Sequence, residues 1–287
     1  MCCDGAVTAP DTDPALLRSV AEKLAAEAAA FVRRRRTEVF GIGAAGRTAA
    51  TAVRAKSTPT DPVTVVDTET ERLLRSRLAD LRPGERILGE EEGGSAGPAD
   101  GVLTWVLDPI DGTVNFMYGI EAYAVSVGVQ RDGTSIAGAV ADVAAGVLFS
   151  AALGHGSRMH RGGVSIELRC SEITELPAAL VGTGFSYRPD RRRRQGEIVA
   201  RLLPEVRDLR RIGSCALDLC MVAAGRLDAY YEDGVQAWDW AAGALIAAEA
   251  GARVRLPGAA GRPDLVVAAA PGISAAFDDV LARCGGM

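Results

Sequence analysis

The stretch WVLDPIDGTVNF at residues 105–116 indicates both the local fold of this chain and its chemistry. Its apolar start predicts a buried strand, and the proline and glycine that follow predict the turn that ends the strand. The turn brings Asp108 and Asp111 to the carboxyl end of the strand, where two carboxylates repel each other unless they are protonated or bridged by a cation. Oxygen ligands on a short loop suit Mg²⁺, and the main-chain carbonyl of Ile110 is a further candidate ligand. The stretch therefore predicts a magnesium site.

The residues after the two aspartates predict the start of a helix. Thr113 and Asn115 stand where such a helix would begin. The free N–H groups at a helix N-terminus attract an anion. A metal site beside an anion site is typical of phosphate chemistry.

The composition is that of an ordinary soluble globular protein, with 48% hydrophobic and 24% charged residues in a chain of 287. This length allows a large core, in one or two domains. The formal charge of −5 argues against a general nucleic-acid binder. Because His155 and His160 are the only histidines, a histidine-rich zinc or iron site is disfavoured.

The cysteines indicate a reducing compartment. None of them forms a CxxC pair, which argues against a zinc knuckle or a redox motif and predicts reduced thiols. The N-terminus carries no basic-then-apolar signal pattern, and no uncharged apolar run is long enough to span a bilayer. We therefore expect a cytoplasmic protein without a membrane partner. The cysteines are Cys2, Cys3, Cys170, Cys215, Cys220 and Cys284.

The first half of the chain predicts an α+β arrangement. Residues up to about Thr12 are expected to be disordered, and a helix is expected to follow. The pair Thr68-x-x-Glu71 predicts a capping box that opens a second helix ending near Leu81. The other expected elements are a helix over 14–36, a mobile loop over 41–56 that carries Lys56, short strands over 63–66 and 87–89, and an antiparallel meander over 122–129, 136–143 and 147–151.

The second half predicts an α/β arrangement, because strand-like and helix-like pieces alternate from about Leu168. There is no internal repeat and no long linker, so we expect an α+β half at residues 1–155 and an α/β half at 156–287 that pack as one unit. The alternating pieces are 179–185, 195–203, 206–212, 214–224, 229–232, 238–250, 265–269 and 273–284.

Four acidic residues elsewhere stand where they could join the two central aspartates. Glu90 follows a strand end in the sequence GEEE, and Asp67 lies between a strand and a helix. Asp239 opens an apolar helix, and Glu232 ends a strand shortly before it. Alternative roles are open for two of them, because Asp239 suits a helix N-cap and Glu232 suits pairing with an arginine.

Together these motifs resemble the inositol monophosphatase family of Mg²⁺-dependent, lithium-sensitive sugar phosphatases. The resemblance runs from about Lys56 to Val254, with DPIDGT, the upstream GEE and the late WD in the family's order and spacing. The pattern looks closest to the actinobacterial SuhB-type branch. The resemblance implies an α/β fold built as a layered αβαβα sandwich of the inositol monophosphatase and fructose bisphosphatase type, a homodimer, and hydrolysis of myo-inositol monophosphate by metal-activated water.

The resemblance also implies a set of metal ligands. Glu90, Asp108 and the carbonyl of Ile110 would hold a first Mg²⁺ ion, and Asp108 would bridge to a second. That second ion would be completed by Asp111 and Asp239. Glu90 would support a third, weaker ion through water, so that about two or three ions act at each site.

Further roles follow from the same resemblance. Asp67 and Thr113 would form a dyad that orients or deprotonates the attacking water, with Glu90 as a further catalytic residue. The amides of Gly112 and Thr113 would hold the phosphate, and Glu232 would bind a ring hydroxyl. Lys56 would lie on the mobile loop over the metals. The other implied substrate-binding residues are Ser214, Cys215 and Asp239, and the family often has alanine where Cys215 stands.

Two alternatives remain open at this point. Related proteins hydrolyse fructose 1,6-bisphosphate, histidinol phosphate or 3′-phosphoadenosine 5′-phosphate with the same metal ligands. A hypothesis of another class is a regulatory protein that binds RNA or the transcription machinery. Only the basic runs Arg33–Arg36 and Arg191–Arg194 support it. We favour a solvated helix end for the first run and an exposed loop or first turn for the second. A nucleic-acid partner is therefore not expected.

Overall fold

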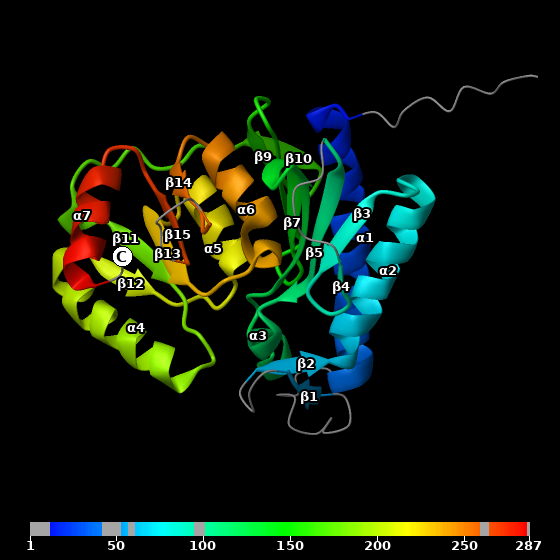
Figure 1. Cartoon of the computed structure of the whole chain (residues 1–287), viewed down its shortest axis with the longest axis horizontal. Helices are drawn as coiled ribbons and strands as arrows, with labels where there is room; N and C mark the ends of the chain where they lie inside the picture. Colours follow the sequence, from blue (N-terminus) through cyan, green and yellow to red (C-terminus); the bar gives the residue numbers. More distant parts are fainter. Residues whose placement is uncertain (1–11, 42–52, 57–60, 95–100, 259–263, 286–287) are drawn as a thin grey trace, which may run out of the picture.

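Helices and sheets alternate in layers across the computed structural model, which describes residues 12–41, 53–56, 61–94, 101–258 and 264–285 (Figure 1). Helices α1 and α2 cover the outer face of a first sheet, α5 and α6 lie between this sheet and a second one, and α4 and α7 cover the far side. This order of layers confirms the expected αβαβα sandwich. Three predictions from the sequence concern residues outside the described ranges. They are the disorder before Thr12, the state of Cys2 and Cys3, and most of the mobile loop.

The first sheet carries the central motif. Its strand order is β10-β9-β8-β7-β6-β5-β3-β4 among the described residues, with β3 parallel to β5 and an antiparallel meander from β5 to β10. The predicted meander is confirmed, whereas β9 and β10 were not predicted. The strands are β3 (Arg86–Gly89), β4 (Gly93–Gly94), β5 (Leu103–Asp111), β6 (Ala124–Arg131), β7 (Thr134–Asp142), β8 (Val147–Ala152), β9 (Ser157–Arg161) and β10 (Val164–Glu167).

The second sheet has the order β12-β11-β13-β15-β14, and β11 runs parallel to both of its neighbours. The predicted alternation of strands and helices in this part of the chain is confirmed, and only β14 was missed. The division after residue 155 stays a prediction. The strands are β11 (Leu180–Thr183), β12 (Asp208–Arg210), β13 (Ala229–Asp233), β14 (Arg253–Arg255) and β15 (Leu265–Ala269).

The helices bury apolar faces against these sheets, in clusters on either side of each sheet. A small antiparallel ribbon of β1 (Val53–Ala55) and β2 (Pro62–Thr64) precedes α2, so the described end of the predicted loop forms a strand. The helices are α1 (Pro14–Phe40), α2 (Val65–Leu81), α3 (Thr113–Tyr118), α4 (Pro189–Leu202), α5 (Cys215–Ala223), α6 (Ala237–Glu249) and α7 (Ser274–Cys284).

Small residues let α6 approach the first sheet closely. A Cβ added at Gly128 would lie 2.9 Å from the Cβ of Ala241, and one added at Gly138 would lie 2.9 Å from the Cα of Ala242. Glycine in a strand interior often marks such a close approach. This packing brings the start of α6, which carries Asp239, toward the end of β5.

Strand β5 is longer than predicted. All nine of its residues are buried, and it continues past Pro109 to Asp111, with a shift in register against β6 between Asp108 and Asp111. The predicted turn at the proline is therefore wrong. The proline is tolerated because it lies in an irregular segment outside the regular ladder. A missing N–H costs no ladder hydrogen bond there.

Helix α2 begins earlier than predicted, and the residues of its capping box are different. Thr64 is the N-cap and Asp67 is the N3 partner, so the box predicted for Thr68 and Glu71 is wrong. The sequence TVVD at 64–67 has the S/T-x-x-acid spacing of a box just as TETE at 68–71 does. Since Thr64 was assigned to a strand, the first match was overlooked.

The arginine run on α1 does not end its helix, which continues to Phe40. The guanidinium of Arg33 donates to the carbonyl of Val143, and that of Arg36 donates to the carbonyl of Phe116. Arg35 pairs with Glu38 and Glu69. These three of the four arginines therefore bind within the protein, while Arg33 and Arg34 are also exposed. The predicted helix end is wrong, and the predicted solvation holds for part of the run.

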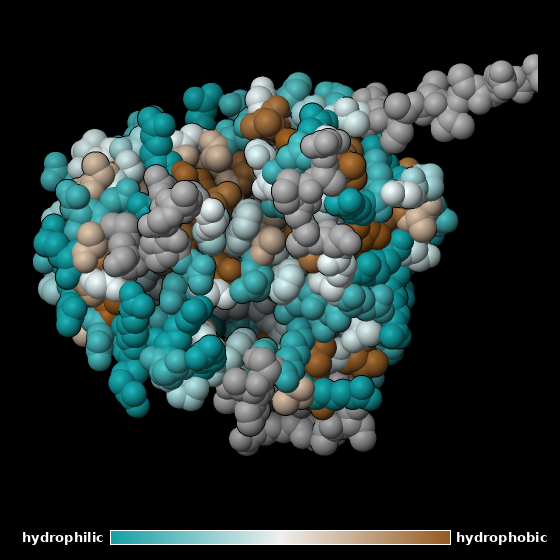
Figure 2. All heavy atoms as spheres, in the orientation of Figure 1, coloured by the Kyte–Doolittle hydropathy of each residue, from teal (hydrophilic) through white to brown (hydrophobic). Residues whose placement is uncertain are grey.

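The surface of the molecule and its cysteines can be compared with the sequence expectations. The face in Figure 2 is mostly hydrophilic, with hydrophobic side chains in separate small groups. No helix in the described ranges is long and apolar enough to cross a membrane. Within the same ranges, Cys170, Cys215, Cys220 and Cys284 are free thiols, as predicted.

Candidate active site

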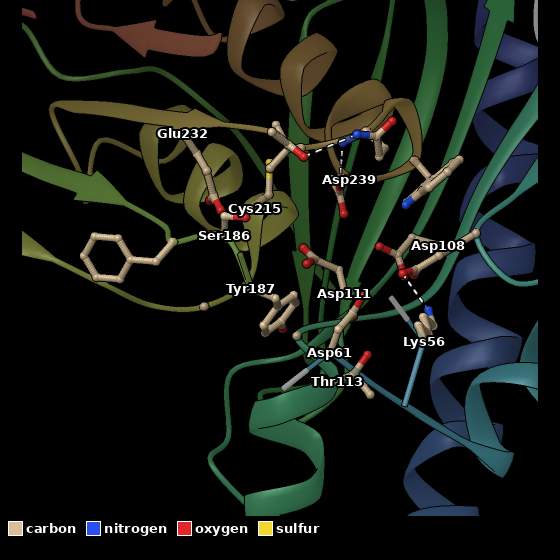
Figure 3. Close-up of a pocket in the computed structure, with 18 of the residues that line it drawn as sticks. Lys56, Asp61, Asp108, Asp111, Thr113, Ser186, Tyr187, Cys215, Glu232 and Asp239 are labelled. Carbon is tan, nitrogen blue, oxygen red and sulfur yellow. Dashed lines mark hydrogen bonds and ion pairs between the residues drawn. The ribbon is translucent and has the colours of Figure 1, made fainter. Parts of the chain in front are cut away.

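A cavity of about 510 Å³ opens where the end of β5 meets the N-terminal ends of α5 and α6. One wall carries the acidic residues of the central motif, and the other carries aromatic and basic side chains. Figure 3 shows the acidic side chains pointing into the space between the walls. The lining residues on the second wall include Phe185, Tyr187, Arg188, Arg191 and Arg211.

Three carboxylates meet in this cavity, as Figure 3 shows. Asp108, Asp111 and Asp239 each offer one oxygen, and these oxygens lie within 4.8 Å of one another. Asp239 on α6 is far in the sequence from the two aspartates on β5, so the three carboxylates come together only through tertiary folding. An all-oxygen set at this spacing fits a hard divalent cation.

Asp111 is fixed from behind by the start of α5. One of its carboxylate oxygens accepts hydrogen bonds from the Ser214 hydroxyl at 2.6 Å and from the Ala216 N–H at 2.7 Å. Ser214 is also the N-cap of α5. The other oxygen of Asp111 therefore stays available to the cavity.

The cluster is electrostatically unfavourable without a cation. Burial raises the pKa of Asp108 well above its usual range, and Glu90, Asp111 and Asp239 raise it further. Burial and the Asp111 charge likewise raise the pKa of Asp239. For Asp111, burial raises the pKa to about 6 against the hydrogen bond from Ser214. A bound cation would relieve this repulsion.

Gly112 makes the sharp turn from β5 into α3. Its φ of 96° is left-handed, and an added Cβ would lie 2.9 Å from the carbonyl oxygen of Ala122. Only glycine suits both conditions. Gly112 and Thr113 line the cavity, at the end of α3 where the first N–H groups lack partners within the helix.

Thr113 and Asp67 form a buried pair below the cluster. The Thr113 hydroxyl lies 3.1 Å from a carboxylate oxygen of Asp67 and 3.1 Å from the carbonyl oxygen of Ile110. Burial raises the pKa of Asp67 to about 6, against the hydrogen bond from the Thr64 hydroxyl. Because both neighbours of the hydroxyl are acceptors, its proton points at one of them and its lone pairs stay free to accept from a water.

The turn that carries Glu90 is held by Glu71, a residue that sequence reasoning placed in a capping box. The fully buried carboxylate of Glu71 accepts hydrogen bonds from the N–H groups of Glu91 at 2.7 Å and Glu92 at 3.0 Å, and it pairs with Arg75. A Cβ at Gly89 would overlap this carboxylate. Glu71 is 20 residues from Glu91 in the sequence, so no local sequence pattern predicts this contact.

Glu90 lines the cavity, but it does not belong to the group of three carboxylates. Lys56 Nζ lies 2.8 Å from Glu90 and 2.5 Å from Glu91. Burial opposes the charge on Lys56, yet the two glutamates raise its pKa. Lys56 therefore lies beside the acidic residues of the cavity.

The residues predicted to bind substrate, together with the predicted catalytic residue Asp67, divide into two groups. Gly112, Thr113, Cys215, Glu232 and Asp239 line the cavity. Ser214 instead lies behind Asp111, where it is almost fully buried, and Asp67 lies behind Thr113. The arginine pairing considered for Glu232 is replaced by a hydrogen bond from Tyr230.

Asp218 on α5 is a buried acid that the sequence did not single out. Its side chain is 1% exposed, and neither carboxyl oxygen has a hydrogen-bond partner among the described residues. Burial raises the pKa of Asp218 well above its usual range, and Glu232 and Asp111 add to this effect. Ionisation of Asp218 therefore opposes folding.

We expect Asp218→Asn to stabilise the protein at neutral pH. The folded pKa of Asp218 is raised, so its favourable contribution is complete below the unfolded pKa and is lost as the pH rises toward the folded pKa. The gain in the free energy of unfolding should thus be absent near pH 4 and grow toward pH 8. Denaturant unfolding of both proteins across this range measures it. An unchanged difference across the range would mean that the charge of Asp218 is compensated.

The chain is similar to known proteins over nearly its whole length. A model of the inositol monophosphatase family matches residues 13–280. The inositol-1-monophosphatase SuhB of Mycobacterium tuberculosis is 64% identical over 287 aligned residues, which cover 98% of each protein. The Nus factor SuhB of Pasteurella multocida is 38% identical over 195 residues, which cover 68% of this chain and 71% of that protein.

Solved structures show the same fold. The structure of Mycobacterium tuberculosis SuhB superposes with a TM-score of 0.82 at 58% identity, over 96% of this chain and 99% of that chain. The similarity therefore covers both walls of the cavity and both sheets.

Proposed function

The chain belongs to the inositol monophosphatase family of phosphoric monoester hydrolases, and on this premise we propose that it releases inositol and phosphate from myo-inositol monophosphate. The observation that carries the proposal is the meeting of Asp108, Asp111 and Asp239 in one cavity beside the Thr113–Asp67 pair. The relatives whose names state this activity support the choice of substrate.

We propose that the cavity binds Mg²⁺. The residues present fit this ion, because three carboxylates with raised pKa values, two of them buried and that of Asp239 half-buried, share one space and all candidate ligands are oxygen atoms. The ligands would be Glu90, Asp108, Asp111, Asp239 and the carbonyl of Ile110, for about two or three ions. Bound Mg²⁺ would neutralise the phosphate dianion and activate water.

The protein's own groups then divide the remaining work. Thr113 accepts a hydrogen bond from the attacking water and is itself oriented by Asp67. The amides of Gly112 and Thr113 hold phosphate oxygens at the start of α3. Glu232, on the opposite wall, accepts from a hydroxyl of the polyol. No side-chain nucleophile is needed, since little covalent chemistry is asked of the protein in phosphoryl transfer.

Phosphate release from a substrate panel tests this function. The panel is inositol 1-phosphate, fructose 1,6-bisphosphate, histidinol phosphate and 3′-phosphoadenosine 5′-phosphate, each with Mg²⁺ and with chelator. We expect the highest kcat/KM for inositol 1-phosphate and loss of all turnover with chelator. A preference for another ester would keep the mechanism and replace the substrate, and turnover that persists in chelator would contradict the proposed metal site.

Further family properties are part of the proposal. We propose that the protein is a homodimer, is inhibited by lithium and is cytoplasmic. These proposals rest on membership of the family.

A regulatory role in transcription is the competing function, since one relative is called a Nus factor. The arginine run Arg191–Arg194 lies in the first turns of α4, and three of its four members make contacts within the protein. Arg191 pairs with Asp233, and the guanidinium of Arg194 donates to the carbonyl of Gly285. These contacts favour the enzyme over a basic patch that binds nucleic acid.

A further inference from the structure

Tyr230 and Glu232 lie on the same face of β13, two residues apart, where side chains of a strand point in the same direction. The Tyr230 hydroxyl donates a hydrogen bond to Oε2 of Glu232 at 2.6 Å. Tyr230 is fully buried, whereas Glu232 reaches the cavity wall. The tyrosine therefore holds the glutamate from behind.

The position of the Glu232 carboxylate is limited on a second side by Gly184. A Cβ added to Gly184 would overlap the carboxylate, so glycine leaves the space that the glutamate occupies. Any larger residue there would push Glu232 away from its present place. Gly184 follows β11, which pairs with β13 in parallel.

Cys215 completes the group from α5. It is buried and lines the cavity beside Glu232 in Figure 3, and its thiol interacts with the Tyr230 hydroxyl. Burial raises the pKa of Cys215 and of Tyr230, so both keep their protons. The Cys215 thiol is thus a small neutral neighbour of Tyr230. This gives a role to a position at which the family often has alanine.

The hydrogen bond also bears on the charge of Glu232. Burial raises the pKa of Glu232 to about 7, and the hydrogen bond from Tyr230 opposes this rise. Donation from the tyrosine therefore favours the carboxylate, which is a stronger acceptor than the neutral acid.

We propose that Tyr230 is a positioning residue that fixes the Glu232 carboxylate to accept a hydroxyl of the substrate, so that the site selects phosphate esters of polyols over esters without alcohol groups. This inference rests on the proposed function. It makes the selectivity depend on a side chain that touches neither the substrate nor the metal ligands.

The test compares two neighbouring tyrosines on two substrates. Tyr230→Phe removes the hydroxyl that binds Glu232. Tyr231→Phe is the matched control, since Tyr231 lies on the other face of β13 and packs against Phe277 with ring centroids 6.1 Å apart. The substrates are inositol 1-phosphate and p-nitrophenyl phosphate, which has no alcohol hydroxyl. Thermal unfolding of each variant checks that it is folded.

We expect Tyr230→Phe to raise KM for inositol 1-phosphate about tenfold, with kcat changed less than about threefold. The kcat/KM for p-nitrophenyl phosphate should stay within about twofold, and Tyr231→Phe should change neither substrate. In a Glu232→Ala background, Tyr230→Phe should have almost no further effect on KM, because the tyrosine acts through the glutamate.

Any other result of these measurements would contradict either the inference about Tyr230 or the proposed substrate. Equal losses on both substrates, or an additive effect in the Glu232→Ala background, would make Tyr230 a structural residue and overturn the inference alone. An unchanged preference for inositol 1-phosphate in Tyr230→Phe would do the same. A wild-type enzyme that shows no preference for inositol 1-phosphate over p-nitrophenyl phosphate would overturn the proposed substrate and the inference with it.

Discussion

Asp111→Asn is expected to lower kcat with inositol 1-phosphate by at least about a thousandfold, while the protein stays folded. Asparagine keeps the shape of the side chain and an oxygen that accepts from Ser214 and Ala216, so the start of α5 stays anchored. What is lost is one negative charge among the three clustered carboxylates. Several kcal/mol of transition-state stabilisation by the metal depend on that charge, and about 4 kcal/mol corresponds to a thousandfold in rate.

Phosphate release across a Mg²⁺ titration, together with the rise of the unfolding temperature on adding Mg²⁺, measures this effect. A ligand that binds the folded state raises that temperature, so the rise should shrink in the variant. Asp228→Asn is the matched control, because Asp228 also accepts from a serine hydroxyl, that of Ser171 at 2.6 Å, and from a backbone N–H, that of Leu180 at 2.7 Å. If both variants lost activity equally, the loss would reflect folding and the metal role of Asp111 would be wrong.

The central motif shows how much of the site local sequence can predict. The two aspartates and the glycine that follow an apolar run indicated a cation site from chemistry alone, and the structure places these aspartates with Asp239 as the resemblance implied. Local periodicity does not show that Asp239 arrives there. That depends on the close approach of α6 to Gly128 and Gly138, which is a tertiary effect.

The errors have a common physical origin. Glu71 was assigned to a local capping box, yet its carboxylate binds the backbone of the distant turn that carries Glu90. Likewise, Arg36 was expected to face solvent, yet it donates to the carbonyl of Phe116. Long side chains choose partners across the fold, whereas sequence spacing reports only neighbours along the chain. Strand β5 extends past its predicted end because the backbone of Asp111 pairs with Ala124 of β6 beyond the proline, and local sequence does not show such pairing.

Thr113→Val is expected to lower kcat by about a hundredfold to ten-thousandfold, with little change in KM, since a positioned acid–base group contributes about that much. Valine has the shape of threonine without the hydroxyl, so the packing of this buried residue is kept. Asp67→Asn should cause a similar loss, because it replaces the acceptor at 3.1 Å that orients the hydroxyl. Steady-state phosphate release with saturating Mg²⁺ measures both variants.

The combination of variants decides whether the pair acts as a unit. If Asp67 works only by orienting Thr113, the double variant should be no slower than the slower single variant, because groups that act together are not additive. Thr113→Ser restores a hydroxyl and should recover most of the rate. Multiplied losses in the double variant would instead give Asp67 a role of its own. Asp67 also accepts from the N–H of Thr64 at the N-terminus of α2, so the unfolding temperature of each variant is measured to check that it is folded. A slow Thr113→Ser variant would show that the hydroxyl is not the group that matters, and the mechanism would then lose its water-orienting residue.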